Sequence, residues 1–130
     1  MHFLIVDDHD SVRRGLRDLL HEKFEHASIT EAQSGEEALL KLGDQEWNLI
    51  FLDLSLPGRN GLDILRDIKK FNPNLPVAIV SSHCERLYAS RSLELGASGY
   101  ISKERALREV LPAAECIHQG GQYFPEDTVK

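Results

Sequence analysis

The sequence lacks most of the features that mark secreted, zinc-binding or membrane proteins. Its 130 residues include only two cysteines, Cys84 and Cys116, and neither belongs to a Cys-x-x-Cys pair, which argues against a disulfide framework and a zinc site. No apolar run approaches the roughly 18 residues that a membrane-spanning helix needs. The start of the chain reaches Asp7 and Asp8 too soon for a signal peptide. These absences predict a cytoplasmic protein without a membrane partner.

An excess of positive charge is absent as well. The chain has 15 Lys and Arg against 21 Asp and Glu, a net charge of −6, which disfavours contact between this domain and nucleic acid. The histidines have no His-Glu-x-x-His or other ligand spacing, so most of them are expected on the surface. With 42% hydrophobic and 28% charged residues, the composition is that of one globular domain with a full core.

Short apolar runs alternate with helical patterns along the whole chain. Apolar runs at residues 3–6, 49–52 and 77–80, together with two shorter strand candidates at residues 28–32 and 99–101, predict five strands. A helical pattern follows each of them, and neither a repeat nor a mid-chain linker interrupts the series. Such alternation implies parallel strands with right-handed crossovers and helices on both faces. The prediction is a single doubly wound α/β domain with a five-stranded parallel sheet.

Capping residues indicate where the first three helices begin. Asp10 is the expected cap of the first helix, and Ser34 with Glu37 forms a capping box for a short second helix that ends near Gly43. Asn60 is the expected cap of the third helix. Each of these side chains can accept a hydrogen bond from a backbone N–H group in the first turn.

The last two helices have weaker signals. The stretch 82–85 has the pattern of a second capping box, and it opens a fourth helix that is thinly apolar. The expected core residues of the fourth and fifth helices are Leu87, Leu93 and Leu95, then Leu107, Val110, Leu111, Ala114 and Ile117. Pro112 lies inside the fifth pattern, so a bend or break is expected there.

Polar side chains gather where the strands end. They are Asp7 and Asp8, Asp53, Ser81 and Ser82, and Lys103. The carboxyl ends of parallel strands share one edge of the sheet, where open α/β sheets place their ligand chemistry. Carboxylates about 5 Å apart repel by about 3 kcal/mol per pair at an effective dielectric near 20, and a divalent cation would offset that repulsion. Oxygen ligands without His or Cys favour magnesium, which typically uses one or two carboxylates and a phosphate.

Four motifs follow one another along the chain: Asp7-Asp8, the stretch Asp53-Leu-Ser-Leu-Pro-Gly-Arg-Asn-Gly, Ser81-Ser82 and Tyr100-Ile-Ser-Lys103. Together and in this order, they resemble the motifs of the receiver domain of two-component response regulators. The resemblance covers nearly the whole chain and implies a flavodoxin-like sheet of order 2-1-3-4-5, with the ligand between the first and third strands. Asp-Asp-His near the start, Lys103 followed by Glu104, and the ending Gly-Gly-Gln-Tyr-Phe resemble the NarL/FixJ (LuxR-type) branch.

The resemblance implies a signalling domain rather than an enzyme with a separate substrate. Asp53 would be the phosphoacceptor that takes a phosphoryl group from the phosphohistidine of a sensor histidine kinase. Asp8 would hold Mg²⁺ directly and Asp7 through a water molecule, with Asp53 and the backbone carbonyl of Ser55 as further ligands. Lys103 would pair with the phosphoryl oxygens as a point charge.

The resemblance also implies a switch. Ser81 would donate its hydroxyl to the phosphoryl group, and Tyr100 would turn inward when Ser81 moves, although a strand aromatic of this kind can equally be a core residue. Ser82 is small, as the family needs beside the incoming group, and it can also cap the fourth helix. His83 faces the attacking water in this family, or it is a solvated histidine.

Two positions depart from the commonest receiver pattern. Residue 81 is Ser rather than Thr, which keeps the hydroxyl and removes a methyl group. Lys103 is followed by Glu104, where many receivers have a proline in a cis bond; a cis bond before any other residue costs roughly 2.5–4 kcal/mol.

The end of the chain resembles the approach to a helix-turn-helix DNA-binding domain. Residues 1–119 are expected to form the receiver and residues 120–130 the start of the linker. A truncated receiver is favoured over a stand-alone one, and a homodimer is a further expected form.

Three other interpretations stay open from the sequence. A phosphatase of the haloacid dehalogenase type would need its nucleophile first in an Asp-x-Asp motif, whereas the acids here are adjacent. A flavodoxin would need hydroxyls and amides after the first strand rather than two aspartates. A receiver that binds partners without phosphorylation is disfavoured by the intact acids and Lys103.

Overall fold

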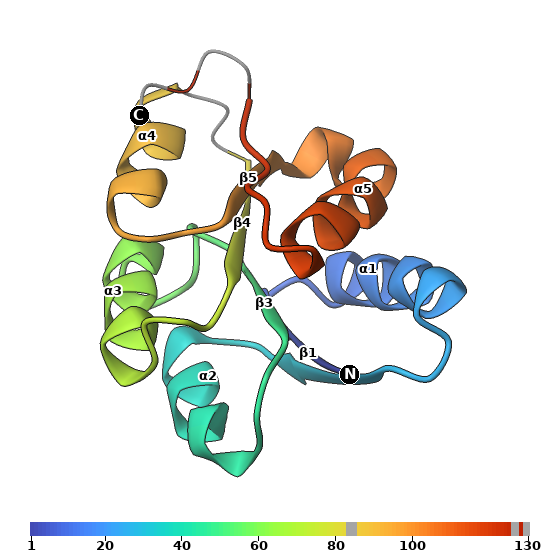
Figure 1. The fold of residues 1–130 in the computed structure, drawn as a ribbon. Coiled ribbons are helices and arrows are strands. Elements are labelled where there is room, and N and C mark those ends of the chain that lie inside the picture. Colours follow the sequence, from blue (N-terminus) through green and yellow to red (C-terminus); the bar gives the residue numbers. More distant parts are fainter. Residues whose placement is uncertain (83–85, 126–127, 129–130) are drawn as a thin grey trace.

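Five short strands form one parallel sheet. The computed structural model describes residues 1–82, 86–125 and 128. The strands are β1 (His2–Val6), β2 (Ser28–Ala32), β3 (Leu49–Leu52), β4 (Val77–Ser81) and β5 (Gly99–Ser102). Their order is β2-β1-β3-β4-β5 (Figure 1). The predicted doubly wound sheet and its strand order are therefore confirmed.

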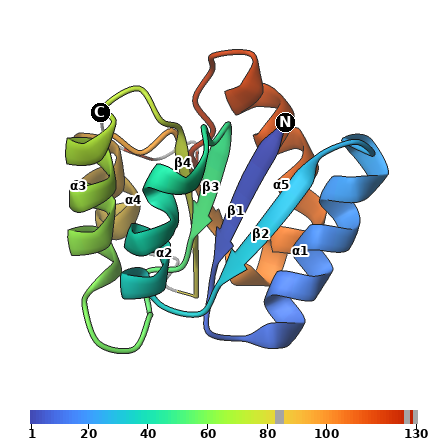
Figure 2. The ribbon, with the colours of Figure 1, turned by 90° about the horizontal axis from the view of Figure 1, so that it is seen from below.

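Helices cover both faces of this sheet. They are α1 (Asp10–Lys23), α2 (Gly35–Lys41), α3 (Gly61–Phe71), α4 (Arg86–Glu94) and α5 (Ala106–His118), with short 3₁₀ turns η1 (Leu42–Asp44) and η2 (Lys103–Arg105). Seen from below, α1 and α5 lie on one side of the sheet and α2, α3 and α4 on the other (Figure 2). None of the helices in the described residues is long and apolar enough to cross a membrane.

The side-chain alternation of the strands divides the core into two layers. Leu4 and Ile50 point toward α2, α3 and α4, whereas Phe3 and Phe51 point toward α1 and α5. The strands β1, β3 and β4 are almost wholly buried because both of their faces are covered. The apolar runs recognised in the sequence are thus the two-sided strands of a parallel sheet.

The register of the strands brings their carboxyl ends to one edge. Val6 of β1 lies opposite Leu52 of β3, and Ser81 of β4 lies opposite Ser102 of β5. Asp7 and Asp53, which directly follow Val6 and Leu52, therefore leave the sheet at the same level. The polar cluster expected at this edge has its structural basis in that register.

The predicted cap of the first helix is wrong by one residue. His9, not Asp10, is the N-cap, and its side chain makes no cap hydrogen bond. Asp10 is instead the first helical residue, and its carboxylate binds the guanidinium groups of Arg13 and Arg14. Two arginines one turn away thus attract the carboxylate that was expected to cap the helix. The caps Ser34 and Asn60 are confirmed by hydrogen bonds to their side-chain oxygens, and the capping box at 82–85 lies largely outside the described residues.

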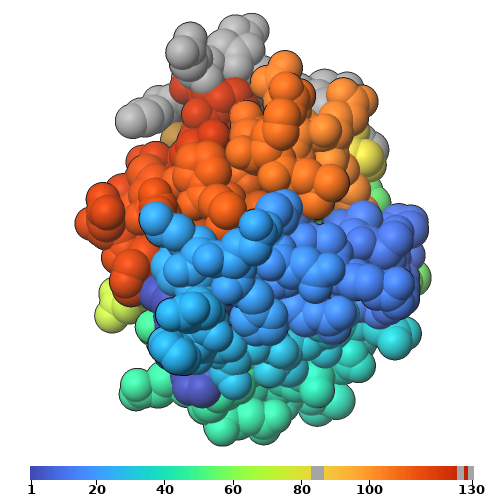
Figure 3. Space-filling model, turned by 90° about the vertical axis from the view of Figure 1, so that its right-hand side faces the viewer, coloured from blue at the N-terminus to red at the C-terminus, as the bar shows by residue number. Residues whose placement is uncertain are grey.

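Two leucines that were expected in the core are on the surface. Leu87 of α4 and Leu107 of α5 are each 63% exposed. Leu107 lies over Gly15 of α1, where an added Cβ would come within 3.2 Å of its Cδ2 atom. Figure 3 shows the face on which α1 (blue) and α5 (orange) lie side by side. An apolar residue at helical spacing can sit at the margin of the buried stripe, and sequence spacing alone does not locate that margin.

Pro112 does not break the last helix. The helix α5 runs without interruption from Ala106 to His118, so the expectation of a break is wrong. Proline removes the hydrogen bond to the carbonyl four residues earlier, which belongs to Arg108. Both residues are exposed, so that water can bind this carbonyl.

The bond between Lys103 and Glu104 is trans, as are all peptide bonds of the described residues.

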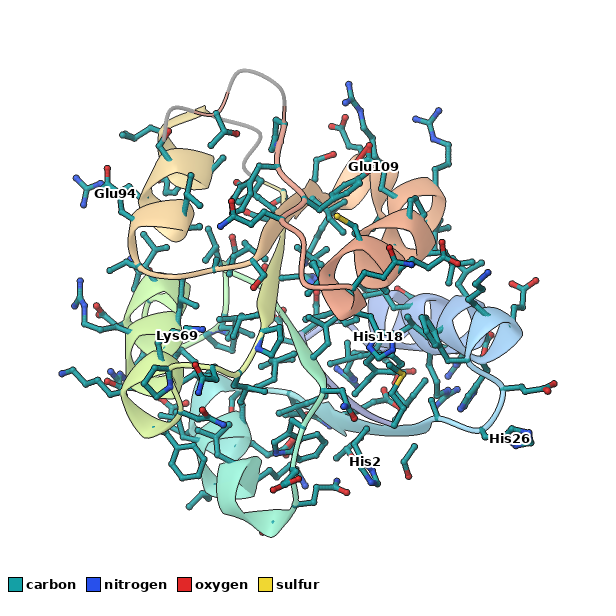
Figure 4. The ribbon with its side chains drawn as sticks, in the orientation of Figure 1. His2, His26, Lys69, Glu94, Glu109 and His118 are labelled. Atoms are coloured by element: carbon teal, nitrogen blue, oxygen red, sulfur yellow. The ribbon has the colours of Figure 1, made fainter. Side chains whose placement is uncertain are left out.

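Most histidines are at the surface, as the sequence predicted. His26 and His118 are exposed; in Figure 4, His26 lies at the margin of the fold, as Glu94 does on the opposite side. Lys69 has a structural role, since its ammonium group donates to the carbonyl oxygen of Leu75 at 2.9 Å (Figure 4).

After α5 the chain turns back along β5. Gly120 has a φ of 91°, a left-handed conformation that glycine adopts without strain, and this turn brings Tyr123 beside the edge strand. The N–H of Tyr123 donates to the carbonyl of Ser98 at 2.9 Å, and the N–H of Tyr100 donates to the carbonyl of Tyr123 at 2.8 Å. Tyr123 and Phe124 also pack on the two core layers. This return segment covers part of the exposed edge of β5.

Deleting residues 120–130 is expected to lower the free energy of unfolding by about 2 kcal/mol. The deletion removes both backbone hydrogen bonds to the β5 edge and exposes the apolar surface under Tyr123 and Phe124. Urea unfolding followed by circular dichroism measures the difference. A shorter deletion, residues 126–130, keeps those contacts and is the matched control. Equal stability of the two shortened chains would contradict the prediction.

Candidate functional site

Three carboxylates from two strand ends meet at the carboxyl edge of the sheet. Asp7 and Asp8 follow β1, and Asp53 follows β3. Asp7 and Asp53 are buried, with relative exposures of 2% and 1%, whereas Asp8 is open to solvent. A ligand atom from each of these acids, and one from His9, lie within 4.8 Å of one another. Such a group of oxygen donors can hold a divalent cation.

Lys103 supplies the positive charge of this cluster. It follows β5, and its ammonium nitrogen lies 3.0 Å from Oδ2 of Asp7 and 3.1 Å from Oδ2 of Asp53. Its side chain is only 16% exposed, so water screens these interactions less than it screens a surface ion pair. The structure thus brings residues 7, 8, 53 and 103 together at the edge where the sequence placed them.

The burial of Asp53 changes the pKa of its carboxyl group. Desolvation raises the pKa of the Asp53 carboxyl above its usual value, and the charge of Asp7 adds to this rise. The N–H of Ser55, 3.0 Å from Oδ1, and the Lys103 ammonium lower the pKa but do not cancel the rise. For Lys103, burial lowers the pKa, but the hydrogen bonds and charges of Asp7 and Asp53 outweigh burial and raise it overall. Lys103 therefore stays charged.

The two residues expected to form the switch lie on β4 and β5, the two strands beyond β3 in the sheet. Ser81 is fully buried at the end of β4, and Tyr100 on β5 is buried in the layer facing α2, α3 and α4. The ring of Tyr100 is thus inside the protein in this conformation. Ser82 follows Ser81 and is exposed, and His83 lies outside the described residues.

With this geometry, comparison with known proteins identifies the family. Residues 3–115 match the model of the response regulator receiver domain. The chain belongs to the response regulator receiver family. The phosphatase and flavodoxin interpretations are therefore set aside, and the chain is a receiver domain of two-component signalling.

Individual relatives place the receiver domain more narrowly. It is 36% identical over 126 residues to the transcriptional activator protein ExaE of Pseudomonas putida, covering 97% of this chain and 59% of the relative. It is 33% identical over 121 residues to the response regulator GacA of Pseudomonas protegens, covering 93% and 57%. A LuxR-family response regulator structure from Aurantimonas sp. SI85-9A1 superposes with a TM-score of 0.90 at 30% identity, covering 98% and 91%.

These relatives confirm the predicted NarL/FixJ (LuxR-type) branch. The receiver domain spans less than two thirds of the length of the curated relatives described above.

The donor set of the receiver domain fits a magnesium ion. Carboxylate oxygens of Asp7, Asp8 and Asp53 are hard ligands, and Mg²⁺ prefers such oxygens together with water. Ser55 adjoins Asp53 through its backbone N–H, which places its peptide near the same group. His9 also faces the acids, with Nδ1 at 3.0 Å from Asp7 and 3.2 Å from Asp8.

Sequence reasoning missed His9 as a neighbour of the acids. The sequence analysis counts it among the surface histidines and uses it in the Asp-Asp-His feature of the branch, without a role at the site, and the residue is indeed exposed. The signal that could have found it is its place directly after Asp8, in the short loop that holds both acids at the sheet edge. Its ring nitrogen Nδ1 also lies 3.4 Å from the Lys103 ammonium, so it contacts Lys103 as well as Asp7 and Asp8.

Gly61 lets α3 approach the Asp53 loop, a role that sequence reasoning also missed. A Cβ added to Gly61 would overlap Cα of Leu54 and lie 2.9 Å from the carbonyl oxygen of Asp53. Both of these are backbone atoms, which cannot rotate away. The available signal was that Gly61 follows Asn60 in the family motif. The need for glycine here comes from the contact between two backbones and not from a left-handed φ.

Replacing Gly61 by alanine is expected to destabilise the domain by about 1 to 3 kcal/mol, because the added methyl group forces the backbone of Asp53 and Leu54 to shift. Chemical denaturation measures the loss. The matched control is Gly43→Ala in η1, where a Cβ would meet no atom within 4 Å. If both variants unfold at the same denaturant concentration, the close approach at Gly61 has no energetic weight.

Proposed function

We propose that this receiver domain stores a phosphoryl group on Asp53 and transmits its presence as a change of conformation. An oxygen of the Asp53 carboxylate attacks the phosphorus of a phosphohistidine on a sensor histidine kinase. The bond from phosphorus to the imidazole nitrogen breaks, the electron pair leaves with the imidazole, and an aspartyl phosphate forms. Asp53 is proposed as the nucleophile because it holds the phosphoacceptor position of the receiver motif, directly after β3, and its Oδ2 lies 3.1 Å from the Lys103 ammonium.

The neighbours of Asp53 would neutralise the charge that arrives with the phosphoryl group. Asp8, Asp7 and Asp53, with the carbonyl of Ser55, are the proposed ligands of Mg²⁺, which supplies Lewis-acid stabilisation of the phosphoryl oxygens when bound. Lys103 lies close enough to transfer its ammonium hydrogen bonds from the carboxylates to the phosphoryl oxygens.

The proposed switch runs from Ser81 to Tyr100. The Ser81 hydroxyl would donate to the phosphoryl group, which would draw the end of β4 toward Asp53. Tyr100 lies on the neighbouring strand, with Ile79 of β4 as its register partner, so a movement at the end of β4 is felt along β5. The Tyr100 ring is buried in this structure, and the proposal is that phosphorylation favours this inward position.

The proposed output is transcriptional control through a C-terminal helix-turn-helix domain that follows the linker beginning at residues 120–130. The support is the name of one relative, a transcriptional activator, of which the receiver covers only part. A cytoplasmic location and a homodimeric active form belong to the same proposal.

The alternative is a receiver that serves as a protein-interaction module without phosphorylation; the complete acid and lysine set, from three separate loops, favours phosphorylation.

The test is to incubate the domain with acetyl phosphate and Mg²⁺ and to examine it by intact-mass and peptide mass spectrometry. One phosphoryl adduct is expected, on the peptide that contains Asp53. Chelation of Mg²⁺ with EDTA should suppress it. Absence of an adduct on the folded domain would favour the interaction-module alternative, and an adduct on another residue would refute Asp53 as the phosphoacceptor.

A further inference from the structure

A buried arginine lies directly behind the acidic loop. Arg13, in the first turn of α1, has a side chain that is only 7% exposed. Nη1 donates to the backbone carbonyl of Asp7 at 2.6 Å. Nε donates to Oε1 of Glu31 at 2.9 Å, and Nη2 to Oδ1 of Asp10 at 3.1 Å. One guanidinium group therefore joins the β1–α1 loop to α1 and to β2.

The carbonyl that Arg13 holds belongs to the peptide unit between Asp7 and Asp8. A peptide unit is planar, so fixing the direction of its carbonyl fixes the orientation of the whole plane. The Cα atoms of the two acids lie at the ends of this plane. The direction in which each carboxylate leaves the chain is therefore tied to the contact with Arg13.

The anchor of this contact is Glu31. Its carboxylate accepts from Arg13 through Oε1 and from Arg17 through Oε2, so two guanidinium groups hold it on β2, an element outside the loop. A charged donor gives a stronger and more directional hydrogen bond than a neutral one. Arg13 is also desolvated, and a buried guanidinium needs hydrogen bonds on its nitrogens to stay charged at an acceptable energy. Here all three nitrogens have a partner.

We propose that Arg13 is a positioning residue for the metal site. It holds the Asp7–Asp8 peptide in the orientation in which both carboxylates face the cation, with Glu31 as the outer support. The inference rests on the proposed function, because it takes from that proposal that the bound cation is Mg²⁺. Residues that orient metal ligands from behind commonly change metal affinity 10- to 100-fold when they are replaced.

Arg17 provides a matched control, because it shares the anchor but not the loop. Its Nη1 donates to Glu31 at 2.8 Å, and its side chain is 36% exposed. Replacing Arg17 by methionine removes one positive charge and one ion pair with Glu31. Unlike the same change at Arg13, it leaves the hydrogen bond to the Asp7 carbonyl in place.

The experiment is a Mg²⁺ titration of the wild type, Arg13→Met, Arg13→Lys and Arg17→Met by isothermal calorimetry, with thermal unfolding of each. We expect the Mg²⁺ dissociation constant to rise about 10-fold in Arg13→Met and to stay within about twofold of the wild type in Arg17→Met. Arg13→Lys should be intermediate, since an ammonium keeps the charge but cannot reproduce the planar fork. In Arg13→Met, amide hydrogen exchange of Asp8 and His9 should also become faster without metal.

A merely structural role predicts a different result. Arg13→Met would then lose thermal stability but bind Mg²⁺ as tightly as Arg17→Met once folded, and this equality would overturn the inference. If Arg13→Met does not fold, Arg13→Lys decides by the same comparison with Arg17→Met. A wild type that binds no Mg²⁺ would instead refute the proposed function, together with the inference that depends on it.

Discussion

Replacing Asp53 by asparagine is expected to abolish phosphoryl uptake and to make the folded domain more stable at neutral pH. Uptake is lost because an amide is not a nucleophile toward phosphorus. Stability rises because the buried Asp53 carboxylate lies near that of Asp7, and asparagine removes one of the two charges. Lys103 keeps Asp7 as its partner at 3.0 Å. A gain of about 1 kcal/mol is expected, as is common when a residue kept for function is replaced.

The same substitution changes how stability depends on pH. Burial raises the pKa of Asp53 above its usual value of 3.8. A carboxyl whose pKa is higher in the folded state contributes stability that is complete below its unfolded pKa and is lost as the pH rises through the folded pKa. The contribution of Asp53 therefore declines from acid toward neutral pH. Asparagine does not ionise, so the variant should gain most over the wild type at neutral pH and least at acid pH.

Urea unfolding at several pH values and mass spectrometry after treatment with acetyl phosphate check both parts. Asp44→Asn is the control, since Asp44 is exposed in η1, which precedes β3, whereas Asp53 follows the opposite end of that strand. This variant should take up a phosphoryl group like the wild type and unfold at the same denaturant concentration. A phosphoryl adduct on Asp53→Asn, or a loss of stability at neutral pH, would count against Asp53 as the buried nucleophile.

Much of the fold could be predicted because its strands are buried on both faces. Runs such as Leu49–Leu52 are apolar without interruption, and a helix follows each run, which leaves few topologies. The helix ends were less predictable, because the side chain expected to cap a helix can instead bind other side chains nearby. Asp10 had the right residue type for a cap, but two arginines in the next turn bind its carboxylate.

The site was predictable as far as strand ends determine it. Parallel strands deliver Asp7, Asp53 and Lys103 to one edge whatever the details of packing. The residues that support the site could not be predicted, because their roles depend on tertiary contacts with other elements. Arg13 looks like any basic residue of an amphipathic helix, and only the fold places Glu31 of β2 and the Asp7 carbonyl around it. Gly61 is likewise informative only once the backbone of Leu54 is seen against it.

Replacing Lys103 by methionine should have the largest effect on the stability of the metal-free domain. Lys103 is the partner of both buried carboxylates, Asp7 and Asp53. Its removal leaves these charges close together without a lysine counter-charge, and breaking a buried ion pair from one side costs about 3 kcal/mol or more. The free energy of unfolding without metal is therefore expected to fall by about 3 kcal/mol. The pKa of Asp53 should also rise further, because the lowering influence of Lys103 is lost.

Mg²⁺ should reverse much of this loss. If the proposed Mg²⁺ ligands hold, the Lys103 ammonium of the wild type competes with the cation for the carboxylates of Asp7 and Asp53, and in the variant that competition is absent. A ligand that binds only the folded state stabilises it more as its affinity increases. Saturating Mg²⁺ should therefore raise the melting temperature of Lys103→Met by more than that of the wild type, whereas phosphoryl uptake falls because the lysine no longer meets the phosphoryl oxygens.

Two further variants separate the charge effect from other causes. Lys70→Met removes a positive charge from an exposed position of α3, and it should unfold like the wild type with and without Mg²⁺. In the double variant of Asp53→Asn with Lys103→Met, a single buried carboxylate remains, so the two changes should be non-additive and part of the lost stability should return. Strict additivity would mean that Lys103 and Asp53 do not interact in the folded state. A smaller response to Mg²⁺ in Lys103→Met would mean instead that the ammonium and the cation do not share the same carboxylates.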